Sequence, residues 1–436
     1  MNFLSALLGQ STLRIGVTGL ARAGKTAFLT SVAANLLAAA LALRPMRVRL
    51  APSGATSLPR FDFGRHLASL AADPPAWPDR TGAVSLLSLE LEFGHGGLLP
   101  PRRLSLEFLD YPGEWLLDLP MLGQDYAAWS AATLRRLQAP QARDFLGFVQ
   151  GLPARAPADE SLAATGHRLY RETLRRLRDE VGLSFLQPGR FLMPAPGPEP
   201  PWTGFFPATL SGPLGELLAA RYDAYREAVR RELVSPLFGR LDRLVVLVDL
   251  LSALHAGPVA YADAANALTE VAAGLRWQRS WLDAIPVLRD LPLPAWLGAG
   301  GIRRVAFAAT KADHVAERQR GNLTALVRSL TRLPEAASGA ATQAFAIAAI
   351  RCTEDFVWTL EGRPVSAVRG RVIGEERMTR SYPGEVPDRS PDAAFWEHRF
   401  LALPAFEPRR LPAGGRAGVS QIGLDTLLAF LLEDFL

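Results

Sequence analysis

Residues 13–28, LRIGVTGLARAGKTAF, constrain the fold of this chain more than any other stretch. An apolar run with strand-like alternation leads into Gly19-Leu20-Ala21-Arg22-Ala23-Gly24-Lys25-Thr26, and a helical pattern follows at once. The segment has the form G-x-x-x-x-G-K-[ST] between a strand and a helix. Such a loop wraps a phosphate with backbone N–H groups at a helix N-terminus, where the helix dipole favours anions. The stretch therefore predicts a phosphate site in an α/β protein.

The positions of this loop have separate expected roles. We expect Lys25 to reach the β- and γ-phosphates and the Thr26 hydroxyl to bind Mg²⁺. Arg22 could stabilise charge in the transition state, although a solvated arginine is the simpler interpretation. The residues expected to contact the nucleotide from the loop are Gly19, Ala21, Arg22, Ala23, Gly24, Lys25, Thr26 and Ala27.

Lysine usage directs attention to a second motif. Lys and Arg total 48, yet Lys25 and Lys311 are the only lysines, so the other 46 basic residues are arginines. The two lysines should occupy sites where a compact ammonium is required and a planar guanidinium fails. Lys311 lies in TKAD, residues 310–313, after an apolar run, and this matches the [NT]KxD motif with which GTPases read guanine. Asp313 is suited to accept two hydrogen bonds from guanine, an edge that adenine lacks, which favours GTP over ATP.

A third motif follows two predicted strands, residues 84–93 and 104–109. The second strand ends in Asp110-Tyr111-Pro112-Gly113, a D-x-x-G sequence. We expect Asp110 to hold Mg²⁺, usually through water, and the Gly113 N–H to sense the γ-phosphate.

Glu114 occupies the next position, where Ras-like enzymes usually carry the glutamine that orients the attacking water. A carboxylate about 4 Å from phosphate oxygens is repelled by about 1–4 kcal/mol per unit charge. Glu114 must therefore point away, pair with a cation such as Arg22, act as a base, or leave the site slow. We expect slow intrinsic hydrolysis, with Lys25, Glu114 and Arg22 as the catalytic candidates.

Three further positions complete the expected site. A predicted strand over residues 343–350 ends in Ala348, Ala349 and Ile350, where a GTPase has its small-residue guanine loop, and the Ala349 N–H is the candidate contact to the base oxygen. Thr81 is the expected third metal ligand, from the switch I loop, with Thr56 as the rival. Asp249, after the apolar run LVVLVDL, is the fallback metal ligand of Walker-B type.

The order of these motifs predicts an α/β fold, a Ras-like P-loop NTPase G domain with a mostly parallel sheet and helices on both faces. We assign residues 1–113, 241–350 and 419–436 to the G domain. Residues 114–240 are expected to form a helical insertion, and residues 351–418 a second insertion with a β-hairpin turning at Glu361-Gly362. Two stretches read as irregular: residues 45–83 as a switch loop, and residues 187–209 as a long surface loop.

Composition sets the remaining limits. The chain has 436 residues and a single cysteine, Cys352, which rules out an intramolecular disulfide framework and fits a reducing compartment. The apolar stretch at residues 27–43 is short for a membrane span, and no secretory signal is evident, so we expect a cytoplasmic protein. A net charge of +5 permits an anionic partner and proves none. The expected partners are guanine nucleotide and a protein effector, with no nucleic acid and at most peripheral membrane contact.

The chain resembles the YcjX-type stress-associated P-loop GTPases of proteobacteria. The resemblance is carried by residues 16–28 (GVTGLARAGKTAF), 110–115 (DYPGEW), 310–313 (TKAD) and 348–354 (AAIRCTE). It implies a Ras-like G domain with an added helical domain that binds GTP and GDP with Mg²⁺. Two alternatives stay open: a P-loop ATPase or kinase with Asp249 as the Walker-B residue, and a nucleotide-stabilised scaffold at a membrane, using residues 3–4 and the last helix.

Overall fold

The computed structural model describes residues 10–20, 22–51, 58–78, 84–93, 102–193, 200, 202, 204–234, 241–283, 302–331, 340–397, 403–411 and 418–435. The chain divides into two units. The first comprises Met1–Pro112, Leu241–Tyr261 and Arg279–Leu436, and the second Gly113–Arg240 and Ala262–Gln278. The borders expected from the sequence between G domain, helical insertion and second insertion remain predictions.

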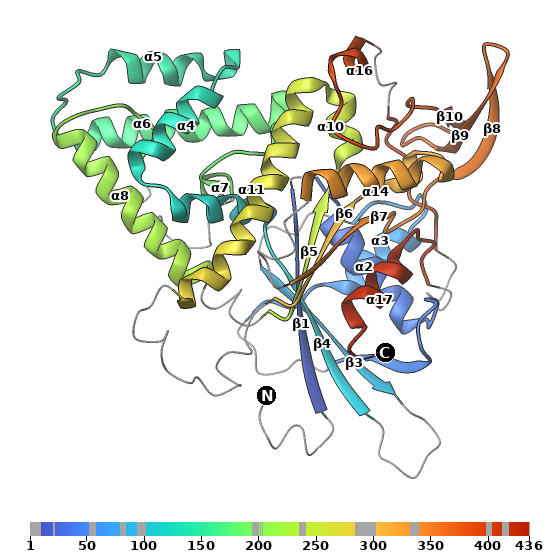
Figure 1. The fold of residues 1–436 in the computed structure, drawn as a ribbon. Helices are drawn as coiled ribbons and strands as arrows, with labels where there is room; N and C mark the ends of the chain where they lie inside the picture. The colour runs from blue at the N-terminus through green and yellow to red at the C-terminus, as the bar shows by residue number, and fades with distance from the viewer. Residues whose placement is uncertain are drawn as a thin grey trace. The chain divides into compact units, whose positions relative to one another are not determined.

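A seven-stranded sheet organises the first unit, in the order β2-β3-β4-β1-β5-β6-β7 (Figure 1). β3 is antiparallel to both of its neighbours, and β4, β1, β5, β6 and β7 run parallel. The predicted mostly parallel sheet is therefore confirmed. The strands are β1 (Gln10–Gly19), β2 (Met46–Leu50), β3 (Ser85–Phe93), β4 (Arg102–Asp110), β5 (Arg243–Val248), β6 (Arg304–Ala309) and β7 (Ala341–Ala346).

Helices cover both faces of this sheet. α2 (Lys25–Leu37) and α17 (Leu424–Leu432) share one apolar cluster with the strands, through residues such as Phe28, Leu428 and Ile15. Neighbouring residues of a strand face opposite ways, so Val305 and Phe307 point to the other side. There α14 (Glu317–Thr331) packs against β6 and β7. All six residues of β5 are buried, as a strand covered on both faces requires.

The buried Arg243 links residues near the C-terminus to the sheet by hydrogen bonds and an ion pair. Arg243, at the start of β5, is only 2% exposed, and its Nε donates to the Leu431 carbonyl at 3.1 Å. The same guanidinium pairs with Asp434. Arg304 on β6 pairs with Glu433 and, at 2.9 Å, with Asp434.

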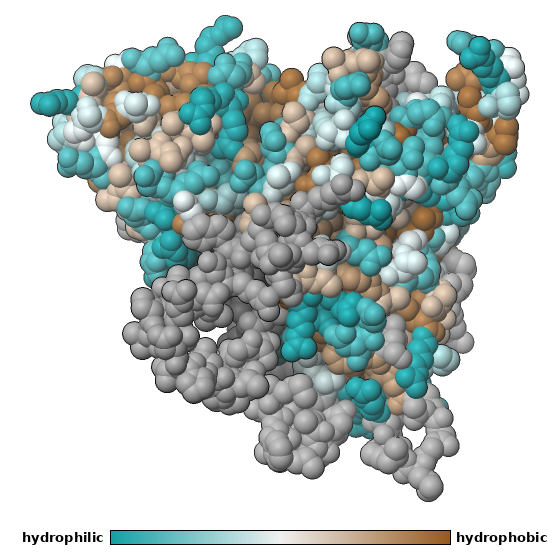
Figure 2. All heavy atoms as spheres, in the orientation of Figure 1, coloured by the Kyte–Doolittle hydropathy of each residue, from teal (hydrophilic) through white to brown (hydrophobic). Residues whose placement is uncertain are grey.

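A three-stranded antiparallel sheet, in the order β10-β9-β8, also belongs to the first unit. Its strands are β8 (Glu354–Leu360), β9 (Arg363–Arg371) and β10 (Met378–Ser381). Glu361 and Gly362 both have positive φ, 49° and 78°, as a two-residue hairpin turn requires, so the predicted hairpin is confirmed. Val357, Ile373 and Met378 leave apolar side chains exposed on or near this sheet. The face of the protein drawn in Figure 2 carries both hydrophilic and hydrophobic residues.

Two stretches expected to be irregular are ordered, so those expectations were wrong. Residues 45–83 contain β2 and α3 (Phe63–Ala71). β2 reads MRVRL and pairs with β3, where Arg49 meets Glu90 across the strands. Asp62 caps the N-terminus of α3, its carboxylate accepting from the Arg65 N–H. The described residues of 187–209 are not a surface loop, because Phe191, Phe205 and Phe206 are buried.

Those phenylalanines belong to the core of the second, helical unit. Trp129 stacks on Tyr222 with ring centroids 5.1 Å apart, and Phe205 packs edge-on against Trp129. A Cβ on Gly166 would lie 2.2 Å from the Phe206 ring, so a helix approaches that ring closely. The helices include α4 (Tyr126–Arg136), α5 (Arg143–Gly151), α6 (Glu160–Arg176), α7 (Gly189–Leu192), α8 (Pro213–Val229) and the middle of α11 (Pro258–Asp283).

The described helices show no candidate membrane span. Across the described ranges, none is both long and apolar enough to span a bilayer.

Candidate nucleotide-binding site

The predicted phosphate loop joins β1 to α2. The Leu20 N–H donates to the Leu247 carbonyl of β5 at 3.0 Å, and the Ala23 N–H donates to the Leu20 carbonyl at 3.1 Å. A Cβ on Gly19 would lie 2.6 Å from the Leu247 carbonyl oxygen, so only glycine fits at this close approach. Gly24 has a φ of 80°, which glycine adopts without strain, and α2 begins at the next residue, Lys25.

The start of α2 has the character of an anion site. No side chain caps it, and its first turn holds no acidic residue. The first N–H groups of a helix have no partner within the helix and carry the positive end of its dipole. Arg22 is exposed, with a φ of 64°, so the loop holds a non-glycine residue in the left-handed region. Ala21 lies outside the described residues.

Two oxygen ligands suited to Mg²⁺ flank this loop. Asp110 is the last residue of β4 and is 2% exposed, and it pairs in register with Val17 of β1. Thr26 is buried in the first turn of α2. A carboxylate and a hydroxyl are the hard oxygen donors that Mg²⁺ prefers, usually with waters and phosphate oxygens completing its shell. The residues therefore fit the ion. Thr81 and its rival Thr56 lie outside the described residues.

Asp313 is fixed from two sides in the loop after β6. It is 2% exposed, and its Oδ2 accepts from the Cys352 N–H at 2.8 Å. The Thr353 hydroxyl donates to the Asp313 carbonyl, and the Ala312 N–H donates to the Ile347 carbonyl at 3.0 Å. The TKAD loop is therefore held against the segment that follows β7.

Lys311 pairs with Asp249, a contact that sequence patterns did not indicate. The Lys311 Nζ lies 2.5 Å from Asp249 Oδ2 and 3.2 Å from the Ser252 hydroxyl. Asp249 also caps α10 (Leu250–Ala256), accepting from the Ser252 N–H at 3.0 Å and its hydroxyl at 2.6 Å. Both Asp249 oxygens are thus engaged, which disfavours the Walker-B role for this residue.

The small-residue loop follows β7, which ends at Ala346 and not at the predicted residue 350. Ala348 forms a two-way backbone bridge with Ile422, donating at 3.0 Å and accepting at 2.9 Å. This bridge uses the Ala348 N–H. Ala349 and Ile350 continue the loop, and the contact of the Ala349 N–H to the base stays a prediction.

Gly113 and Glu114 begin the second unit, in the 3₁₀ segment η1 (Gly113–Gly123). A Cβ on Gly189 would lie 1.7 Å from the Glu114 carbonyl oxygen, so α7 touches the backbone here. The Trp115 indole donates to the Met193 carbonyl at 2.9 Å. The catalytic roles expected for Gly113 and Glu114 stay predictions.

The η1 segment also holds a buried carboxylate that the sequence analysis did not single out. Asp118 is fully buried, accepting from the Tyr225 hydroxyl at 2.6 Å and the Gly189 N–H at 2.7 Å. Burial raises the pKa of Asp118 to about 6, against the opposing effect of these hydrogen bonds and of Arg190. An aspartate inside an apolar run was the only signal that could have marked it.

The comparisons with known proteins agree with this geometry. The chain matches the family model described as "YcjX-like family, DUF463" over residues 13–436. It is similar to "Ras-like GTPase YcjX" of Escherichia coli (strain K12), with 34% identity covering 99% of this chain and 98% of that protein. It is also similar to "Ras-like GTPase YcjX" of Shewanella oneidensis (strain MR-1), with 30% identity covering 97% and 94%. The predicted resemblance is confirmed, and the chain belongs to the YcjX-like family.

Proposed function

We propose that this chain is a Mg²⁺-dependent GTP-binding protein that hydrolyses GTP slowly and acts as a nucleotide-dependent conformational switch. One observation carries the proposal: the phosphate loop, Asp110 and Asp313 lie at or just after the carboxyl ends of three parallel strands of one sheet, β1, β4 and β6. Open α/β sheets bind ligands at the carboxyl ends of such strands. The names of the two relatives, both called Ras-like GTPase, support the same function.

The phosphates would lie at the N-terminus of α2. The backbone N–H groups of Gly24, Lys25, Thr26 and Ala27 would donate to their oxygens, whereas those of Leu20 and Ala23 are bonded within the protein. The Lys25 ammonium supplies a mobile positive charge. The exposed Arg22 adds a second cation close to the loop.

Thr26 and Asp110 would hold Mg²⁺, with Thr81 as a third proposed ligand. When bound, the ion neutralises charge that develops on the phosphate oxygens. Asp110 would hold the metal, usually through water, and Gly113, three residues later, would sense the γ-phosphate.

The guanine base would be read by Asp313, with the Ala349 N–H on the base oxygen and Ala348 and Ile350 beside it. The Cys352 N–H orients the Asp313 carboxylate, so the acceptor is fixed before the base arrives. Lys311 is neutralised by Asp249 and lies beside the base site as a positioning residue.

Hydrolysis would be slow because Glu114 replaces the water-orienting glutamine of Ras-like enzymes. A protein effector would then have time to read the GTP-bound state before it decays. We propose that this takes place in the bacterial cytoplasm and in the stress response, as the resemblance to stress-associated GTPases suggests.

The test is binding of fluorescent GTP and ATP analogues, with phosphate release followed in the same samples. We expect Mg²⁺-dependent, guanine-selective binding that weakens at least about a hundredfold in Lys25→Ala, since a charged phosphate contact is lost. Arg49→Ala, which removes an exposed cation on β2, is the matched control and should bind normally. Equal affinity for both nucleotides, or unchanged binding in Lys25→Ala, would refute the proposal.

The metal site is tested with a pair of aspartates. Asp110→Asn should abolish the Mg²⁺ dependence of nucleotide binding, whereas Asp249→Asn should preserve it. The opposite result would support the alternative in which Asp249 is the Walker-B residue of an ATPase.

A further inference from the structure

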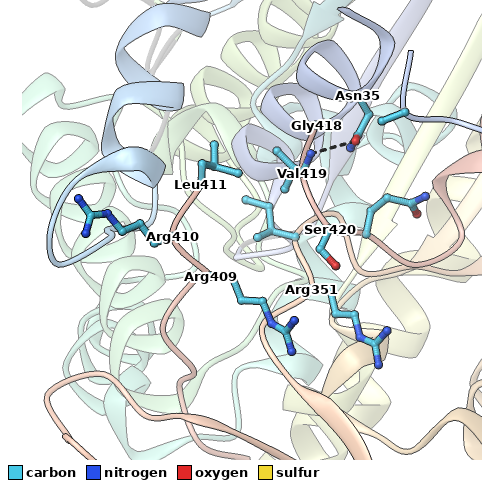
Figure 3. Close-up of a pocket in the computed structure, with 11 residues that line it drawn as sticks. Asn35, Arg351, Arg409, Arg410, Leu411, Gly418, Val419 and Ser420 are labelled. Atoms are coloured by element: carbon cyan, nitrogen blue, oxygen red, sulfur yellow. Dashed lines mark hydrogen bonds between the residues drawn. The ribbon is translucent and has the colours of Figure 1, made fainter. Parts of the chain in front are cut away.

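A cavity of about 430 Å³ lies in the first unit, behind the base loop (Figure 3). Its walls come from Asn35 near the end of α2, from Ile350 and Arg351, and from the segments around Arg409 and Val419. We call it the Arg351–Arg409 cavity. Leu411 and Val419 give it an apolar wall, and Ser420 and Gln421 add polar groups. Its volume suits a small metabolite.

Two guanidinium groups lie together on this cavity. Arg351 Nε and Arg409 Nη2 both donate to the Thr353 carbonyl, at 3.1 and 3.4 Å, so the two groups are neighbours. Figure 3 shows their side chains extending in the same direction, while Arg410 points away from them. Arg351 is 31% exposed and Arg409 is 43% exposed, so both are open to a ligand.

Both arginines keep donors for a ligand. Arg351 bonds Asp355 through Nη2, and Arg409 bonds Glu354 through Nη2. Each guanidinium carries five N–H donors. Among the residues that the structure describes, hydrogen bonds leave Arg351 Nη1 and Arg409 Nε and Nη1 available. No acidic side chain is found among the described residues lining the cavity.

The walls of the cavity continue into the nucleotide site. Asn35 lies on α2, the helix whose first turn carries Lys25, and its Oδ1 accepts from the Val419 N–H at 3.0 Å. The Arg351 N–H donates to the Ser420 carbonyl at 2.7 Å. The next residue, Cys352, orients Asp313. An occupant that fixes Arg351 and Val419 therefore also fixes the base-reading segment and α2.

We propose that the Arg351–Arg409 cavity binds a small multivalent oxyanion, such as a phosphorylated or polycarboxylated metabolite, and that its occupancy slows release of guanine nucleotide. The donors that the two adjacent guanidinium forks leave unbonded, on Arg351 Nη1 and on Arg409 Nε and Nη1, can donate to several oxygens of such an anion at once. Binding to the cavity is independent of the proposed function, whereas the effect on nucleotide release rests on it.

The probe for binding is inorganic pyrophosphate, titrated by calorimetry into the full chain in saturating GDP, with Mg²⁺ in excess over both GDP and the probe so that the phosphate loop stays occupied. We expect one site whose affinity falls about tenfold in Arg409→Gln and also falls in Arg409→Lys, which keeps the charge but not the fork. Arg318→Gln is the matched control, since Arg318 is 55% exposed and also bonds one carboxylate. Its affinity should stay within about twofold of wild type. Equal affinity in Arg409→Gln and wild type would overturn the proposal.

The effect on the nucleotide is measured as dissociation of fluorescent GDP after dilution. Pyrophosphate should slow dissociation at least about fivefold in wild type and not in Arg409→Gln, since coupling of that size is common between linked sites. Pyrophosphate that binds at Arg409 but leaves dissociation unchanged would overturn the coupling. A chain that binds pyrophosphate but no GDP would instead refute the proposed GTP-binding function.

Discussion

The neighbours of each buried carboxylate determine whether it is available to bind a ligand. Asp249 and Asp313 both follow buried strands, and sequence patterns made each a candidate ligand-binding residue. Contacts separate them: Asp249 has both oxygens on Ser252 and Lys311, whereas the backbone of Cys352 orients Asp313. Such pairings could not be predicted, because they join residues that only the folded chain brings together.

Asp313→Asn should change base preference. An amide can keep the bond from Cys352 through its oxygen, while its N–H groups meet the 2-carbonyl of xanthine and no longer accept from guanine. We expect GTP affinity to fall at least about a hundredfold and affinity for xanthosine triphosphate to rise. Competition between the two nucleotides measures this, and unchanged guanine preference would rule out Asp313 as the base reader. Asp144→Asn, at a side chain that is 74% exposed, serves as the control and should keep the guanine preference.

Asp118 should make the stability of the second unit depend on pH. Its pKa in the folded chain is about 6, against an ordinary value of 3.8. The folded state therefore binds the proton more tightly, so this group's stabilisation is complete below about pH 3.8 and is lost as pH rises to about 6. The loss is about 3 kcal/mol in the free energy of unfolding.

Asp118→Asn removes that titration. The variant should gain stability relative to wild type as pH rises from about 4 to about 7, measured by urea unfolding. Asp144→Asn, at a side chain that is 74% exposed in the same unit, should follow wild type. A parallel pH dependence in Asp118→Asn and wild type would show that another group titrates.

Strands and turns could be predicted from the sequence where a local residue pattern alone determines them. The fully buried β5 is a continuous apolar run, and the β8–β9 hairpin turns at Gly362, a glycine suited to positive φ. β2 and the aromatic segment around Phe205 were missed because partners distant in sequence decide them. β2 is stabilised by pairing with β3, and Phe205 by rings from three helices, whereas Pro and Gly nearby suggested loops.

Within the second unit, η1 and α7 approach so closely that there is no room for a side chain at Gly189. Gly189→Ala would place a methyl group 1.7 Å from the Glu114 carbonyl, so backbone must shift. We expect a loss of about 1–3 kcal/mol in the unfolding free energy of this unit. Urea unfolding followed by tryptophan fluorescence measures it.

Gly147→Ala in α5 is the control for that substitution, since nothing lies within 4 Å of its added methyl group. A helix-interior alanine should gain about 0.5–1 kcal/mol. Equal effects of the two substitutions would contradict the close contact.

At the scale of the whole molecule, the last residues stabilise the middle of the sheet. Asp434→Asn removes the carboxylate that pairs with the buried Arg243, so we expect the unfolding free energy of the first unit to fall by about 1–3 kcal/mol. Glu433→Gln loses only an exposed pair with Arg304 and should cost less than about 1 kcal/mol. Hydrogen exchange of the β5 amides distinguishes the two variants, because Asp434→Asn should lower their protection more than Glu433→Gln. Equal protection in both variants would contradict the prediction.

The order of the strands has a consequence for synthesis on the ribosome. β1 and β4 are complete at Asp110, but α17, which shares their apolar cluster, ends at Leu432. At about 5–20 residues per second, that interval lasts roughly 15–60 s. During that interval the second unit can fold, while the apolar face of β1 and β4 is not yet covered by α17. We therefore expect nascent chains to bind chaperones that cover β1 and β4. A chain truncated before α17 should aggregate.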